Sequence, residues 1–171
     1  MTINDGLNAL QSNNTLIMLI AASIALYRYK RTSFVVAALV LCFANVLHMI
    51  FQFFLNILFD SALYDGFIYE FTVRLWYIFY AVTDMFFAVF IYTILKRMSI
   101  KPGVHCHIIC GCFVLLGFIQ IGRYADRFIL SADYLSQVYT VGIPFINTFL
   151  LVVVLAGLFF DHKISSAKKG Y

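Results

Sequence analysis

The sequence predicts an all-α membrane protein, an up-and-down bundle of five transmembrane helices. Three observations indicate this class: 63% of the 171 residues are hydrophobic, only 12% are charged, and long apolar stretches alternate with short polar connections. Soluble domains carry about a quarter charged residues, so the charged fraction here is about half the usual one. We expect one transmembrane domain over residues 1–171, with no nucleic-acid partner, because the basic residues sit in short connections and in the tail.

The first predicted span, residues 7–27, is the weakest. Its second half is apolar, whereas its first half carries polar side chains such as Asn8, Gln11 and Asn14. About twelve apolar residues reach only ~18 Å, which is too little for a bilayer, so we expect the whole segment to cross. The alternative is an interfacial helix, which leaves a bundle of four spans.

The second span, residues 33–59, carries a polar stripe within a strongly apolar sequence. The stripe consists of Asn45, His48, Gln52 and Asn56. Spacings of three and four residues place these side chains within about 80° of arc on one helix face. Such a face turns toward other helices or toward a water-filled crevice, because lipid offers it no hydrogen-bond partner.

The third span, residues 67–95, holds Glu70, Arg74, Tyr77 and Asp84, which helical spacing places on one face. Asp84 lies roughly 18 Å from the basic end of this span, near the middle of the bilayer. A carboxylate at that depth costs a few kcal/mol and must be protonated, paired or hydrated.

Two further spans complete the bundle. The dipeptide Pro102-Gly103 predicts a turn before the fourth span, residues 104–127. The fifth span, residues 138–160, contains Pro144 as a predicted kink, and a basic tail over residues 161–171 follows.

Lysine and arginine predict the orientation of the bundle. Most of them fall at one end: Arg28, Lys30, Arg31, Lys96, Arg97, Lys101, Lys163, Lys168 and Lys169. The positive-inside rule places that end in the cytoplasm. We therefore expect a cytoplasmic (inner) membrane protein with an external N-terminus and a cytoplasmic C-terminus.

The polar residues of the spans predict an intramembrane polar site near the midplane and in the outer half. Its expected members are Asn45, His48, Gln52, Asn56, Asp84 and Asn147. The inner halves are nearly all apolar, so the pattern predicts a crevice open to the outside. Two interpretations of Asp84 remain: a hydrogen-bonding anchor to Asn45, or a ligand or proton site with His48.

A second group of charged and polar residues is expected nearer the outer surface: Glu70, Arg74, Gln120, Arg123 and Arg127. This outer charged cluster could bind an anion or a lipid headgroup, or its members could neutralise one another. Aromatic residues between Arg74 and Tyr80 are typical of an interfacial belt, and the alternative is a pocket for a flat ligand.

Histidine and cysteine crowd the start of the fourth span, at His105, Cys106, His107, Cys110 and Cys112. They form no CxxC pair and have no second ligand pair elsewhere, so we expect no metal. We also expect no cofactor and no catalytic residue.

These features predict a small non-enzymatic protein that acts as a sensor, adaptor or subunit of a membrane complex. Its expected partners are the lipid bilayer and either further copies of the chain or another membrane or cytoplasmic protein. The first alternative is a proton-coupled carrier or channel that uses Asp84 and His48. A weaker alternative is a cofactor-binding redox membrane protein.

Overall fold

The computed structural model describes residues 3–29, 32–61 and 66–167, and all regular structure in this part of the chain is helical. The predicted all-α class is therefore confirmed. The five helices are α1 Ile3–Tyr29, α2 Ser33–Ser61, α3 Gly66–Arg97, α4 Val104–Phe128 and α5 Ser136–Ala167. Lys30, Arg31, Lys168 and Lys169, which entered the charge analysis, lie outside the described residues.

Four of these helices, α2 to α5, are long and apolar enough to cross a membrane. This is the architecture of a multi-pass membrane protein. The apolar part of α1, Asn14–Tyr29, is shorter than a full span by the same measure, although α1 itself is one continuous helix. That α1 crosses the bilayer therefore stays a prediction.

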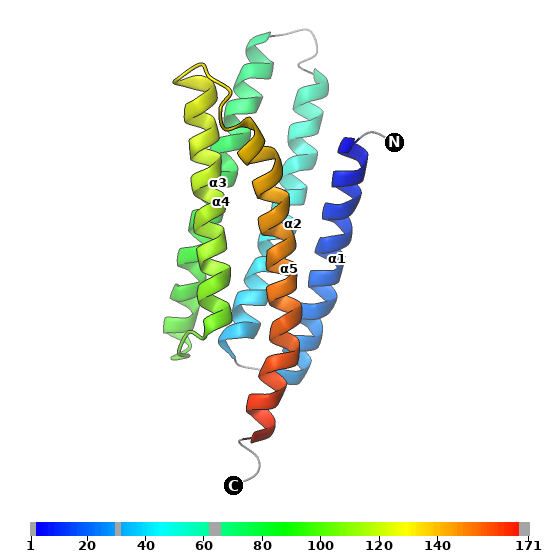
Figure 1. The fold of residues 1–171 in the computed structure, drawn as a ribbon, viewed down its shortest axis with the longest axis vertical. Helices are drawn as coiled ribbons and strands as arrows, with labels where there is room; N and C mark the ends of the chain where they lie inside the picture. The colour runs from blue at the N-terminus through cyan, green and yellow to red at the C-terminus, as the bar shows by residue number, and fades with distance from the viewer. Residues whose placement is uncertain (1–2, 30–31, 62–65, 168–171) are drawn as a thin grey trace.

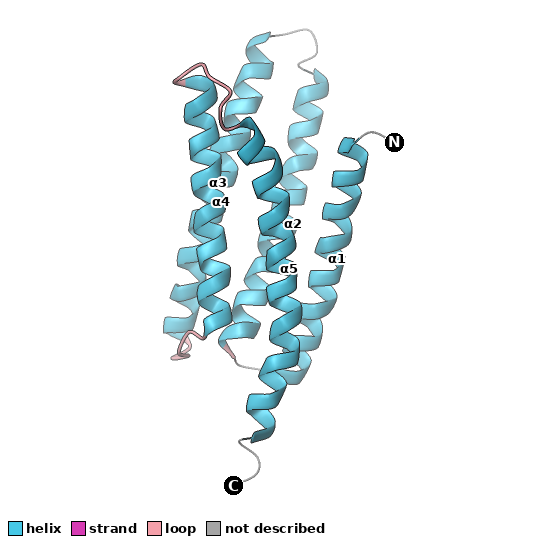
Figure 2. Cartoon of the chain, viewed as in Figure 1, coloured by secondary structure: helices cyan, strands magenta, loops and turns pink. Residues whose placement is uncertain are grey.

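The helices alternate in direction and close into a ring (Figure 1). Each helix packs on its neighbour in the sequence, α5 packs back on α1, and α2 also touches α4 across the ring. Helix α1 begins at the upper end, where the α4–α5 connection also lies, and α5 ends at the lower end (Figure 1). Figure 2 shows that loops occur only at the two ends.

The turn between α3 and α4 is held by two hydrogen bonds from backbone N–H groups, one to a backbone carbonyl and one to a side chain. Ser99 takes a left-handed conformation (φ 55°), and the N–H of Ile100 donates to the carbonyl of Leu95 at 2.9 Å, which ends α3. The N–H of Gly103, at the start of α4, donates to Ser33 Oγ at 3.0 Å. The start of α2 is therefore tied to this turn.

The lower half of the bundle is a close-packed apolar core. Small residues on α1 and α2, such as Ala25 and Ala37, are fully buried and allow the helices to approach closely. Phe34 lies against Gly157 of α5, where an added Cβ would come within 2.3 Å of its ring. Larger side chains fill the space between α3 and α4: Phe87, Ile91, Leu95, Ile109 and Phe113.

The helices are longer than their predicted apolar spans. The largest difference is in α5, which continues to Ala167, so most of the predicted basic tail is helical. Residues 161–167 contain neither proline nor glycine, and nothing in their sequence ends a helix where it leaves the apolar region. Pro144 also leaves α5 continuous.

Candidate functional site

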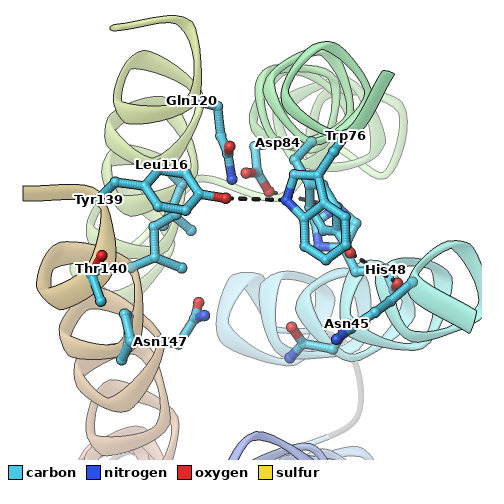
Figure 3. Close-up of a pocket in the computed structure, with 13 residues that line it drawn as sticks. Asn45, His48, Trp76, Asp84, Leu116, Gln120, Tyr139, Thr140 and Asn147 are labelled. Carbon is cyan, nitrogen blue, oxygen red and sulfur yellow. Dashed lines mark hydrogen bonds and ion pairs between the residues drawn. The ribbon is translucent and has the colours of Figure 1, made fainter. Parts of the chain in front are cut away.

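A pocket of about 410 Å³ lies between α2, α3, α4 and α5 in the upper half of the bundle. Small-molecule sites in proteins are typically concave and about 300–1,000 Å³ in volume. Its lining is formed by Asn45, His48, Gln52, Trp76, Tyr80, Asp84, Leu116, Gln120, Tyr139, Thr140, Ile143, Pro144 and Asn147. Figure 3 shows the labelled polar side chains converging from the four helices.

The pocket brings together the residues of the predicted intramembrane site, except Asn56. Asn45, His48 and Gln52 reach it from α2, and Asp84 and Asn147 reach it from α3 and α5. Asn56 is exposed and absent from the lining, because α2 continues upward past the rim of the pocket. The helical stripe thus identified the lining face of α2 but not the height at which the pocket ends.

His48 is held by its neighbours on α3. Its Nε2 lies 2.9 Å from Thr83 Oγ1, and the Thr83 hydroxyl already donates its single hydrogen to the backbone, to the carbonyl of Phe79 at 2.8 Å. Thr83 therefore accepts from His48, which places the proton on Nε2. Asp84 Oδ1 lies 3.8 Å from the same nitrogen, close to it but beyond hydrogen-bond distance.

Two buried acceptor atoms in the pocket have no partner. Within the described part of the chain, Asp84 Oδ1 and Gln120 Oε1 are the buried side-chain atoms that make no hydrogen bond. Asp84 is 2% exposed and Gln120 is 4% exposed. The expected bond from Asn45 to Asp84 is not formed, since the Asn45 amide donates instead to Met18 Sδ of α1. Such unpartnered buried groups are rare in native structures and require an explanation.

The members of the outer charged cluster do not form one group. Arg123 is buried and paired with Asp126 and Asp133, one on α4 and one in the α4–α5 connection. Asp126 also accepts a hydrogen bond from the backbone N–H of Leu135 at 3.1 Å. This network holds the connection against the end of α4, and it leaves Arg123 without free charge for an external anion.

The remaining members of that cluster separate in the same way. Glu70 and Arg74 form an exposed ion pair on α3. Arg74 and Arg127 both lie over the ring of Phe128, at 4.8 and 5.6 Å from its centre. Gln120 belongs to the pocket. The three α4 members of the cluster are separated because Gln120 and Arg123 lie on the buried face of the helix, whereas Arg127 lies on its exposed face.

Two aromatic residues that the sequence analysis placed in an interfacial belt line the pocket in the structure. Trp76 and Tyr80 lie on the pocket side of α3, two turns and one turn above Asp84 respectively, with ring centres 5.3 Å apart. Tyr139 faces them from α5, and its oxygen accepts a hydrogen bond from Trp76 Nε1 at 3.1 Å (Figure 3). The i, i+4, i+8 spacing of Trp76, Tyr80 and Asp84 is a signal that could have linked them.

The histidine and cysteine residues near the start of α4 lie at the opposite end of the bundle. Cys106, Cys110 and Cys112 are buried, and His107 Nδ1 lies 2.7 Å from the Tyr92 hydroxyl. Among the described residues, no group of three histidine, cysteine or acidic side chains is placed to hold a metal ion.

No protein family model, curated protein or solved structure matches this chain. The chemistry of the pocket therefore stands on its geometry alone. It offers aromatic walls, unpartnered acceptors and an apolar floor, which is an arrangement for binding.

Proposed function

We propose that this protein is a small non-enzymatic receptor subunit, a sensor or adaptor of a cytoplasmic membrane, that binds a small molecule from the outer side. The observation that carries the proposal is the upper pocket with its two buried acceptors, Asp84 Oδ1 and Gln120 Oε1. A ligand that satisfies them would gain hydrogen bonds that the protein alone does not supply.

The apolar core beneath the pocket supports binding over transport. Phe87, Ile91 and Leu95 continue the inward face of α3 below Asp84, and each is at most 1% exposed. A carrier needs a polar path through this half of the bundle, because an ion in hydrocarbon is costly. The sequence places most lysines and arginines at this lower end, which supports a cytoplasmic assignment for it.

Signalling would then depend on the helices themselves. Nearly all described residues lie in the five helices, so a bound ligand would act through helix faces or through the lower end of α5. Association with further copies of the chain, or with another membrane or cytoplasmic protein, is part of this proposal.

Thiol labelling tests the crevice directly. Thr140→Cys and Asn147→Cys place a thiol at the rim and inside the pocket, and we expect a membrane-impermeant thiol reagent to label both from outside. Val152→Cys is the matched control on α5, because Val152 is 54% exposed on a membrane-spanning helix and absent from the pocket lining. The native cysteines are buried and should give little background.

Labelling of Asn147→Cys from the cytoplasmic side would contradict the proposal, since it would show an aqueous path through the core. Equal labelling of Val152→Cys and Asn147→Cys from outside would contradict it too. In that case the reagent would not distinguish the pocket from the lipid-facing surface.

The second candidate is a proton-coupled carrier, and the observation in its favour is the 3.8 Å distance between His48 Nε2 and Asp84 Oδ1. Reconstituted in liposomes under an imposed proton gradient, a carrier would give a flux that disappears in Asp84→Asn. The receptor proposal expects no flux in either protein.

A further inference from the structure

The protein itself satisfies several hydrogen-bond donors of the pocket but leaves two of its buried acceptors without a partner. Five donors of the lining are already bonded within the protein: Trp76 Nε1 to Tyr139, His48 Nε2 to Thr83, the Tyr80 hydroxyl to the His48 carbonyl, the Asn45 amide to Met18, and the Thr140 hydroxyl to the Ser136 carbonyl. Its two unpartnered buried atoms, Asp84 Oδ1 and Gln120 Oε1, are both acceptors. The pocket therefore calls for a ligand that donates.

Pro144 adds a third acceptor to the lining. A proline has no backbone N–H, so the carbonyl of Thr140, four residues earlier in α5, lacks the donor that a helix would otherwise supply. Thr140 and Pro144 both line the pocket. The α5 wall of the pocket therefore includes a backbone carbonyl that lacks its helical donor.

Aromatic rings form the wall above these acceptors. Trp76 and Tyr80 are tilted by 34° to each other, and Tyr139 closes the opposite side (Figure 3). The faces of such rings attract a cation within about 6 Å, and tryptophan attracts it most strongly.

The pocket lining contains an acidic side chain, Asp84, but no lysine or arginine among the described residues. The nearest buried guanidinium, that of Arg123, is already paired with two carboxylates. An anionic ligand would therefore meet no opposite charge, whereas a cation would meet the carboxylate of Asp84.

We propose that the pocket binds a protonated amine, with its ammonium group between Asp84 and Gln120, beneath the aromatic side chains, and its apolar part against Leu116 and Ile143. This assignment rests on the receptor function proposed above and names the class of its ligand. An ammonium group supplies several N–H donors, which can bond to the two unpartnered acceptors, and a positive charge, which can pair with the carboxylate of Asp84.

Trp76 provides a reporter within the site, because it is the single tryptophan of the chain and lines the pocket. The purified full-length protein in detergent is titrated, at constant ionic strength and pH 7, with three probes of one shape. They are cyclohexylmethylamine, cyclohexylmethanol and cyclohexanecarboxylate; the amine is protonated at this pH, as a lysine side chain is. We expect a saturable change in Trp76 fluorescence with the amine at a concentration about tenfold or more below that needed for the alcohol. We expect none with the carboxylate.

Asp84→Asn tests the source of this preference. The change removes the charge and keeps the size, so we expect the amine to bind no more tightly than the alcohol, with binding of the alcohol retained. Glu70→Gln is the matched control, since it removes an exposed carboxylate from the same helix outside the pocket. It should keep the full preference for the amine.

The outcomes separate the ligand class from the receptor function. Saturable binding of the alcohol or the carboxylate at or below the amine concentration overturns the amine and leaves a ligand-binding pocket standing. An amine preference that survives Asp84→Asn overturns it too. If no probe changes the fluorescence, the amine is overturned, and the thiol labelling of Asn147→Cys then decides separately whether the crevice exists.

Discussion

Two aspartates of this protein are equally buried and should respond in opposite ways to the same substitution. Asp84 and Asp126 are each 2% exposed. Asp84 Oδ1 has no hydrogen-bond partner, whereas Asp126 Oδ2 accepts from Arg123 at 2.7 Å and from the N–H of Leu135 at 3.1 Å. Replacing each with leucine, which has the same branched shape and the same number of side-chain heavy atoms, removes an unsatisfied acceptor in one case and a satisfied one in the other.

The magnitudes follow from these contacts. An unsatisfied buried polar group costs about 1–3 kcal/mol, so Asp84→Leu should raise the free energy of unfolding by about that amount. Breaking a buried ion pair by removing one partner costs about 3–5 kcal/mol. Arg123 keeps Asp133, which is 76% exposed at its side chain, so Asp126→Leu should lower the free energy of unfolding by ~3 kcal/mol, near the lower limit.

Thermal melting in detergent measures both changes. In a chain of this length, 1 kcal/mol corresponds to a shift in Tm of about 2–4 °C. Asp84→Asn should fall between the native protein and Asp84→Leu, because it removes the charge but keeps a polar group. A loss of stability in Asp84→Leu as large as that in Asp126→Leu would refute the reasoning and would identify Asp84 as a structural anchor between helices.

Three further predictions concern the packing, the orientation and the closed core. Gly157→Ala should lower the free energy of unfolding by about 1–3 kcal/mol, because its Cβ would overlap the buried ring of Phe34; Phe34→Leu should recover part of the loss, and Gly111→Ala, with nothing within 4 Å, should cost nothing in the same melting assay. A reporter that is active only outside the cell, fused after Tyr171, should give no signal, and a strong signal there would invert the proposed orientation. His48→Ala should alter the response to a pocket ligand without creating a proton leak in liposomes, and a leak measured with an interior pH dye would contradict the closed core.

The fold could be predicted from the sequence because a bilayer leaves a chain few choices. Apolar stretches of this length must become helices to satisfy their backbone groups, and short connections make neighbouring helices antiparallel. The turn at Pro102-Gly103 could also be predicted, because proline and glycine together are a strong local signal for a turn. The residue at which α5 ends could not be predicted, since residues 161–167 are compatible with both a helix and an extended tail outside the lipid.

The candidate site was predictable only in part. Spacing alone placed Asn45, His48 and Gln52 on one face of α2, and counting residues placed Asp84 at a similar depth. Neither could tell that His48 bonds to Thr83, because a choice between adjacent residues of α3 depends on how that helix is rotated. The partners of Arg123 depend on the turn that brings Asp133 back to α4, and a helical face predicts no such contact.

The pocket also explains why the bundle tolerates unpartnered buried acceptors. Helices α2 and α5 both pack on α1, and the pocket lies between polar residues of α2, α3, α4 and α5. Closing that space would require a hydrogen-bond donor at Asp84 and another at Gln120, whereas Trp76, His48, Tyr80 and Asn45 of the lining already donate to Tyr139, Thr83, the His48 carbonyl and Met18. Since those internal bonds fix the lining side chains in place, the site is rigid but incomplete. A donor supplied from outside the chain is what would complete it, which is why binding follows from this geometry more directly than catalysis or transport does.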